Sequence, residues 1–229
     1  MRLLRLLLAA FVLGAPSAAL SQEWSDYMST MDRFSITFPG QPTVQEITWP
    51  SEYGAVFPGR VYAVKQGAST FSVTVIDYTQ SEKLHAAIRK ELSFQDPRYW
   101  QIDIQASIQY AATKFRQRPG SKVTYDAWHY IDLVEGHQLQ LSNQDMTRTF
   151  VGIYLHENRL YIVEATVPQG NPPPGLFQQN LSFLDEKGGR VRYNEIYSNR
   201  LPPLPARGGG GGRGGGGRGD GAGGRGGAQ

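Results

Sequence analysis

The four histidines are the first candidates for metal ligands or catalytic bases, and their spacing argues against a zinc site. They are His85, His129, His137 and His156, and no two of them are four residues apart, the spacing that places two ligands on one face of a helix. The chain has no cysteine, so the common structural zinc sites are also excluded. We therefore expect neither a metal nor another cofactor.

Asp126, His129 and Asp132 form the best local cluster of possible ligands. On a helix, a spacing of three would gather the three side chains on one face. We interpret the segment as a strand, where His129 points away from both carboxylates. A satisfied strand histidine beside exposed acids is thus the preferred interpretation, and His137, which follows a predicted turn, is expected to be solvated.

Catalytic nucleophiles are not indicated by any local motif. There is no cysteine and no Gly-x-Ser-x-Gly elbow. Glu164 interrupts an otherwise apolar strand, and we expect Arg148 or Arg159 to pair with it rather than a catalytic role. The sequence therefore predicts a protein that is not an enzyme.

The aromatic residues Trp49, Tyr53 and Phe57 cluster in and beside a predicted loop over residues 50–59, which contains two prolines and two glycines. Tryptophan and tyrosine on loops are favoured for binding a protein or carbohydrate surface. The alternative interpretation is that these rings cap the end of the core. Trp128 and Tyr130 share one face of a predicted strand and are expected to fill the space between sheet and helices.

The elements that must position these residues follow from periodicity and turn signals. Alternating apolar residues predict strands, and the predicted strands cover 34–38, 44–49, 60–66, 70–78, 123–134, 137–142, 148–155 and 160–167. Turns are expected at Gly67-Ala68-Ser69, at Glu135-Gly136 and at Glu157-Asn158.

Three helices complete the pattern. Thr79 and Glu82 form a capping box ahead of an apolar stripe of Leu84, Ile88 and Leu92. Asp96-Pro97 starts a second helix over 98–116, where the spacing is also compatible with a strand but the length favours a helix. A last helix follows Pro172-Pro173-Pro174, with a buried stripe of Phe177, Leu181 and Leu184. The predicted fold class is α+β, with an antiparallel sheet of about six to eight strands covered by two to three helices.

The two ends of the chain differ from the middle. Residues 1–21 combine Arg2 and Arg5, a short apolar run and small residues, which is typical of a secretory signal, and we predict cleavage between Ser21 and Gln22. Residues 22–200 are expected to form one domain. Residues 201–229 are a proline-rich linker followed by a Gly/Arg-rich tail, expected to be disordered and to touch anionic surfaces weakly. The protein is predicted to be periplasmic or secreted, in a bacterium.

Charge is unevenly distributed. The chain has a formal net charge of +3, but the two ends carry more positive charge than that, so residues 22–206 are slightly acidic. A domain of this charge offers no basic stripe for nucleic acid. The apolar run near the N-terminus is also too short to span a bilayer.

Two segments resemble PsbP-like domains. Residues 34–42 (Phe-Ser-Ile-Thr-Phe-Pro-Gly-Gln-Pro) resemble the strand and turn that open such domains, and residues 160–168, with a helix carrying Phe177 and Phe183, resemble their last strand and helix. The resemblance covers roughly residues 30–190. It implies the PsbP-like sandwich and a role as an accessory or assembly factor, as for the photosystem subunits and the Ran-binding import factor of this superfamily, and it brings no catalytic motif.

The function predicted from the sequence is therefore an exported binding or assembly-accessory domain whose partner is a protein or an envelope component. The alternative is a periplasmic protein that binds a small molecule or an envelope polymer through the aromatic residues of segment 49–57. Neither the partner nor the oligomeric state follows from the sequence.

Overall fold

The structure, a computed structural model, describes residues 23–91, 98–197 and 199. The predicted signal and its cleavage site, the tail, Leu92 and the Asp96-Pro97 helix start lie outside the described residues. No helix in the described ranges is long and apolar enough to cross a membrane.

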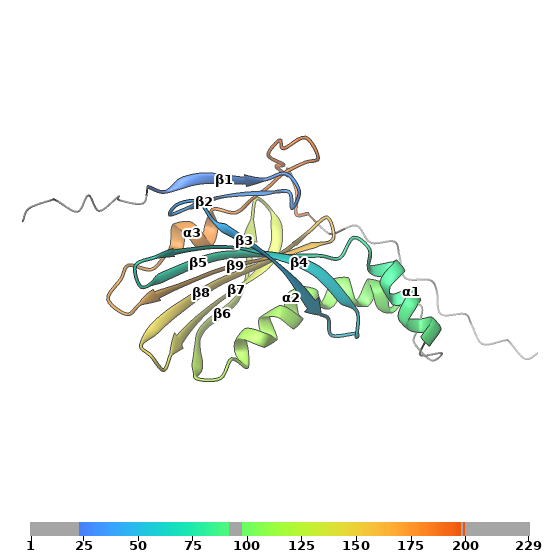
Figure 1. The fold of residues 1–229 in the computed structure, drawn as a ribbon, viewed down its shortest axis with the longest axis horizontal. Helices are drawn as coiled ribbons and strands as arrows, with labels where there is room; N and C mark the ends of the chain where they lie inside the picture. Colours follow the sequence, from blue (N-terminus) through green and yellow to red (C-terminus); the bar gives the residue numbers. More distant parts are fainter. Residues whose placement is uncertain (1–22, 92–97, 198, 200–229) are drawn as a thin grey trace, which may run out of the picture.

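A seven-stranded antiparallel sheet forms the centre of the fold (Figure 1). Its spatial order is β3-β4-β5-β9-β8-β7-β6, so two runs of hairpins meet where β5 pairs with β9. The strands are β3 (Thr43–Pro50), β4 (Val56–Gln66), β5 (Ser69–Asp77), β6 (Ser121–Ile131), β7 (Val134–Asn143), β8 (Thr147–His156) and β9 (Arg159–Pro168). The predicted α+β class is confirmed.

Two further layers cover the faces of this sheet (Figure 1). A small sheet, ordered β1-β2-β10, covers one face together with the short helix α3. Helix α2 lies on the other face, and α1 packs against α2 beyond the end of the strands; both helices are in the connection between β5 and β6. The bounds are β1 (Ser25–Ser29), β2 (Phe34–Phe38), β10 (Ser182–Phe183), α1 (Ser81–Glu91), α2 (Tyr99–Arg116) and α3 (Gly175–Gln179).

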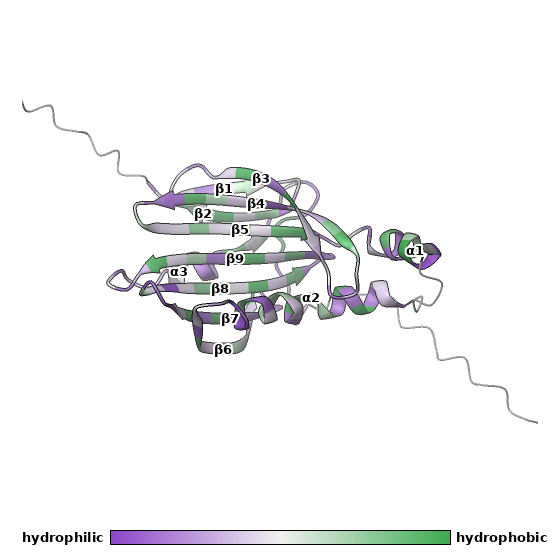
Figure 2. Ribbon diagram, turned by 60° about the horizontal axis from the view of Figure 1, so that its bottom comes forward, coloured by the Kyte–Doolittle hydropathy of each residue, from purple (hydrophilic) through white to green (hydrophobic). Residues whose placement is uncertain are grey.

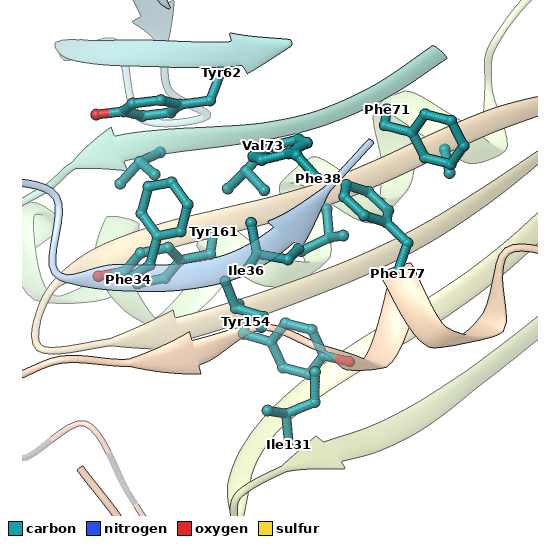
Figure 3. Packing of buried hydrophobic residues seen from close by; sticks show 14 of the residues in the cluster. Phe34, Ile36, Phe38, Tyr62, Phe71, Val73, Ile131, Tyr154, Tyr161 and Phe177 are labelled. Atoms are coloured by element: carbon teal, nitrogen blue, oxygen red, sulfur yellow. The ribbon is translucent and has the colours of Figure 1, made fainter. Parts of the chain in front are cut away.

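Hydrophobic side chains alternate along the strands and fill both spaces between the layers (Figure 2). Phe34, Ile36 and Phe38 project from β2 onto the large sheet, where Tyr161 and Phe177 are among their neighbours (Figure 3). Ile104, Ala111 and other apolar residues of α2 pack on the opposite face. Because burial of apolar area is the main favourable term in folding, these two cores hold the three layers together.

Asp32, in the turn between β1 and β2, ties the small sheet to the large one. Its Oδ1 accepts a hydrogen bond from Arg60 Nη1 at 2.6 Å, and its Oδ2 accepts one from the Tyr62 hydroxyl at 2.5 Å. The Tyr161 hydroxyl donates to the Asp32 carbonyl at 2.9 Å. Burial, followed by the hydrogen bond to Asp32, raises the pKa of Tyr62 well above its usual range, so the phenol remains a donor.

Several predicted boundaries are wrong. The hairpin after β6 turns at Asp132 and Leu133, both with positive φ, whereas Glu135 and Gly136 lie in β7. The last helix ends at Gln179, and Leu181 and Leu184, which were expected in its buried stripe, lie on either side of β10. Helix α1 begins at Ser81, so Gln80 rather than the expected Thr79 precedes it. Strands β1 and β10 were not predicted, because the β1 sequence Ser-Asp-Tyr-Met-Ser has no alternation of apolar residues and β10 has only two residues.

Gly136 lies in β7 because Tyr154 of β8 packs directly against its backbone. A Cβ at this position would overlap the Tyr154 ring and the Ile153 carbonyl oxygen. We expect Gly136→Ala to lower the free energy of unfolding by about 1–3 kcal/mol, the usual range for overpacking. Urea titration measures the loss, and Gly170→Ala, where nothing lies within 4 Å of the added Cβ, is the matched control. Equal stability of the two variants would contradict the prediction.

Candidate functional site

Of the three aromatic residues of segment 49–57, Trp49 and Phe57 pack in the core between the large sheet and the helices. Trp49 is the residue before the end of β3 and pairs with Phe57 of β4, and the loop between the two strands is only residues 51–55. Phe57 is fully buried, with its ring 4.1 Å from that of Tyr78. Tyr53, in the loop, is half-buried, and its ring centre lies 5.4 Å from that of Tyr99. Phe57 therefore caps the core and is not accessible to a partner.

A buried polar cluster lies behind this loop. Asp103 Oδ2 accepts a hydrogen bond from Ser51 Oγ at 2.5 Å and lies 2.8 Å from His85 Nε2. All three side chains are buried. The residue types are those of a hydrolase triad, but the serine donates to the carboxylate rather than to the histidine, which is not the order that activates a nucleophile. The cluster ties the loop to α1 and α2.

The candidate ligands Asp126, His129 and Asp132 do not come together. Asp126 accepts hydrogen bonds from Arg116 Nε at 2.7 Å and Arg116 Nη2 at 3.0 Å, and it contacts His137 Nε2. These bonds, Arg116 first, lower the pKa of Asp126 to about 2. His137 is buried rather than solvated, because the turn lies earlier in the chain than predicted, at Asp132 and Leu133, and His137 is part of β7.

His129 lies on the other face of β6, with its Nδ1 3.2 Å from the Tyr154 hydroxyl. Burial lowers its pKa. Asp132 is in the hairpin turn. Strand geometry therefore separates the three residues, and within the described ranges no group of three or more potential ligands could hold a metal ion.

Two other expectations about side chains are wrong. Glu164 pairs with Arg118 at 2.8 Å, not with Arg148 or Arg159, because the residue after α2 passes over this part of β9. Trp128 and Tyr130 are about half exposed, since β6 is an edge strand that the helices leave uncovered. Trp128 contacts the His137 ring edge-on at 5.3 Å.

A different site has the geometry of a ligand groove. It lies where the start of the small sheet, the β4–β5 turn and the loop after β9 meet, and it encloses about 480 Å³. We call it the Trp24 groove. The residues that line it are Trp24, Thr37, Gln66, Ser69, Phe71, Val167, Asn171, Pro172, Pro173, Pro174, Leu176, Phe177 and Asn180.

Phe71 and Phe177 form an aromatic floor in the Trp24 groove, and Trp24 forms one wall. The ring centres of Trp24, Phe71 and Phe177 lie 5.2–6.3 Å apart in edge-on contacts, a favourable geometry for aromatic pairs. Phe71 and Phe177 are buried, whereas Trp24 is 47% exposed and Leu176 is 88% exposed. The rim thus presents apolar surface to solvent, which a folded protein normally hides.

Local sequence explains the shape of the rim. Three consecutive prolines have no amide to donate to a neighbouring strand, so the chain leaves the sheet after β9. Asn171 donates to Ser69 Oγ at 3.3 Å and Asn180 donates to Thr37 Oγ1 at 2.6 Å, which ties the loop to both sheets. None of the described residues that line the groove is charged.

The Trp24 groove was missed by sequence reasoning because its residues come from five separate segments. The sequence indicates only a helix start at Pro172-Pro173-Pro174. Trp24 lies close to the predicted cleavage site, and no local pattern marks it as a binding residue. An unusually exposed tryptophan cannot be recognised without its surroundings.

Comparisons with known proteins return solved structures of low similarity and no sequence family. No family model and no curated protein matches the sequence. Among solved structures, the chain is similar to cyanobacterial PsbP of Synechocystis, with 8% identity and a TM-score of 0.38 over 69% of this chain and 87% of that one. A Pseudomonas aeruginosa protein of unknown function is similar over 66% of this chain and 97% of its own, with 11% identity and a TM-score of 0.27. Nothing about family or activity follows from either similarity.

Proposed function

We propose that the protein is an exported binding protein, without catalytic activity, whose recognition site is the Trp24 groove. The observation that carries the proposal is the aromatic floor with an exposed, uncharged rim. Recognition sites commonly bury a few aromatic anchors at their centre and keep a polar rim. The polar cluster at Asp103 joins α1 to α2, and the one at Asp126 joins α2 to β6.

The partner class is an extended apolar segment of a protein. Small-molecule sites usually enclose most of the ligand surface. The half-exposed Trp24 and the exposed Leu176 leave the groove open along one side, which suits a chain segment that continues into solvent. The interpretation of segment 49–57 as the ligand site is not favoured, because Phe57 is inaccessible.

An apolar fluorescent probe tests the groove. Anilinonaphthalene sulfonate should bind the full chain with increased emission, and Trp24→Ala should weaken its binding at least fivefold, because the variant removes one wall of the groove. Trp128→Ala removes a tryptophan of similar exposure, 56%, from the β6 edge and is the matched control. Equal probe affinity in the two variants would contradict the proposed site.

Export is tested by the mass of the mature chain. After expression with the leader in a bacterial host, the chain recovered from the periplasm or the medium should begin at Gln22, because the small residues Ala19 and Ser21 fit the leader-peptidase pattern. Intact-mass spectrometry measures this directly. A chain that keeps residues 1–21 and sediments with membranes would contradict the export proposal and leave the groove assignment unaffected.

A further inference from the structure

The described C-terminal segment is fixed at one end of the large sheet. Asn199 accepts a hydrogen bond from the Asn158 amide at 3.0 Å and donates one to Asn158 Oδ1 at 2.5 Å. Tyr197 bonds to the Glu157 amide at 3.0 Å and packs on the His156 ring at 4.8 Å. Asn199 therefore lies at the turn between β8 and β9.

The Trp24 groove lies at the opposite end of the same strands. Val167, in its wall, is nine residues from Asn158 along β9. At about 3.3 Å per residue, the two ends are roughly 30 Å apart.

Residues 201–205 have a chemistry that matches this groove. Their sequence, Leu-Pro-Pro-Leu-Pro, is uncharged and favours an extended polyproline conformation. Proline-rich segments of this kind dock into aromatic-lined grooves, because little conformational entropy is lost on binding. The indole of the half-exposed Trp24 adds an N–H donor for a peptide carbonyl.

The segment cannot reach the groove of its own chain. Pro205 is six residues beyond Asn199, so it extends at most about 20 Å from it, and Leu201 at most about 7 Å. Both distances are shorter than the length of β9. If residues 201–205 occupy a Trp24 groove, the groove must therefore belong to a different copy of the chain.

We infer that the Trp24 groove binds residues 201–205 of a second copy of the chain, so that copies associate head to tail. The inference rests on the proposed function of the groove. Charge favours it further, because the basic residues after 206 would approach the slightly acidic domain of the other copy. A contact of this kind is heterologous and forms rings or open chains.

A complementation experiment tests the inference with two variants that each lose one half of the contact. In analytical ultracentrifugation, the full mature chain should show a mass that rises with concentration. Trp24→Ala, with an intact tail, and a chain truncated after Asn199, with an intact groove, should each remain monomeric. Their mixture should form a heterodimer, because one supplies the segment and the other the groove.

Two further variants keep the test decisive. Leu201→Ser combined with Leu204→Ser changes only residues outside the described ranges, and it should abolish association without changing the melting temperature, even if Trp24→Ala is itself less stable. Trp128→Ala should associate like the full chain. A truncated chain that still associates, or a mixture that stays monomeric, would overturn the inference.

The probe experiment separates failure of this inference from failure of the proposed function. If the apolar probe binds in a Trp24-dependent manner while complementation fails, the occupant is a segment of another protein and the binding function stands. If binding of the probe does not depend on Trp24, both the inference and the proposed function of the groove are wrong.

Discussion

Replacing Asp32 by alanine should lower the free energy of unfolding by about 3 kcal/mol, the lower end of the range for removing one partner of a buried ion pair. The Asp32 side chain is 4% exposed and that of Arg60 is 28% exposed. The variant leaves the guanidinium without its carboxylate and the Tyr62 hydroxyl without its acceptor. Because Arg60 retains some contact with water, we expect the lower rather than the upper end of that range.

Urea titration of Asp32→Ala against Asp26→Ala tests the prediction. Asp26 is also an acid of the β1–β2 hairpin, but its bond to Thr37 Oγ1 at 2.6 Å is exposed, so its removal should change stability by no more than about 0.5 kcal/mol. Asp32→Asn keeps an acceptor for Tyr62, so its loss in the free energy of unfolding should lie between those of Asp32→Ala and Asp26→Ala. If Asp32→Ala costs no more than Asp26→Ala, Asp32 does not join the two sheets in the way that the hydrogen bonds indicate.

Acidification should destabilise the protein through His156. This residue is fully buried: its Nε2 lies 2.7 Å from the Tyr193 hydroxyl, and its ring stacks on Phe183 at 4.4 Å. Burial lowers its pKa to about 4 against the opposing effect of Glu157, while Arg159 and Arg33 lower it further. Since the folded pKa lies below the unfolded value of about 6.5, the unfolded state binds more protons between these values.

Stability should therefore be fully present above pH 6.5 and should decline as the pH falls toward 4, by up to about 3 kcal/mol from this residue alone. Urea titrations at several pH values in this window measure the slope. His156→Phe lacks this pH-dependent contribution. The free energy of unfolding of the unmutated protein minus that of the variant should therefore fall as the pH falls. A constant difference across the window would show that His156 does not titrate as a buried neutral base.

Local sequence was sufficient for the elements with long, regular patterns. The alternation of Phe34, Ile36 and Phe38 marks β2 and its core face, and helix α2 follows from its length despite a pattern compatible with a strand. The hairpin after β6 was misplaced for a specific reason: Glu135-Gly136 has the composition of a turn, but Gly136 is required by the Tyr154 ring on the next strand.

The partners of charged side chains depended on packing between distant segments. Glu164 was expected to pair, but its partner Arg118 lies 46 residues away and is positioned by the end of α2. The buried state of His137 and the exposure of Trp128 likewise follow from which strand occupies the edge of the sheet.

The amino-acid sequence by itself determined the α+β class, most of the strands and the absence of a recognisable nucleophile or zinc motif, because these depend on residues near one another in the chain. Only the tertiary structure decided which aromatic residues are accessible, placing Phe57 in the core and Trp24 in a groove wall. The physical reason is that a groove is a property of surfaces brought together from separate segments, and periodicity along one segment carries no information about what packs across from it.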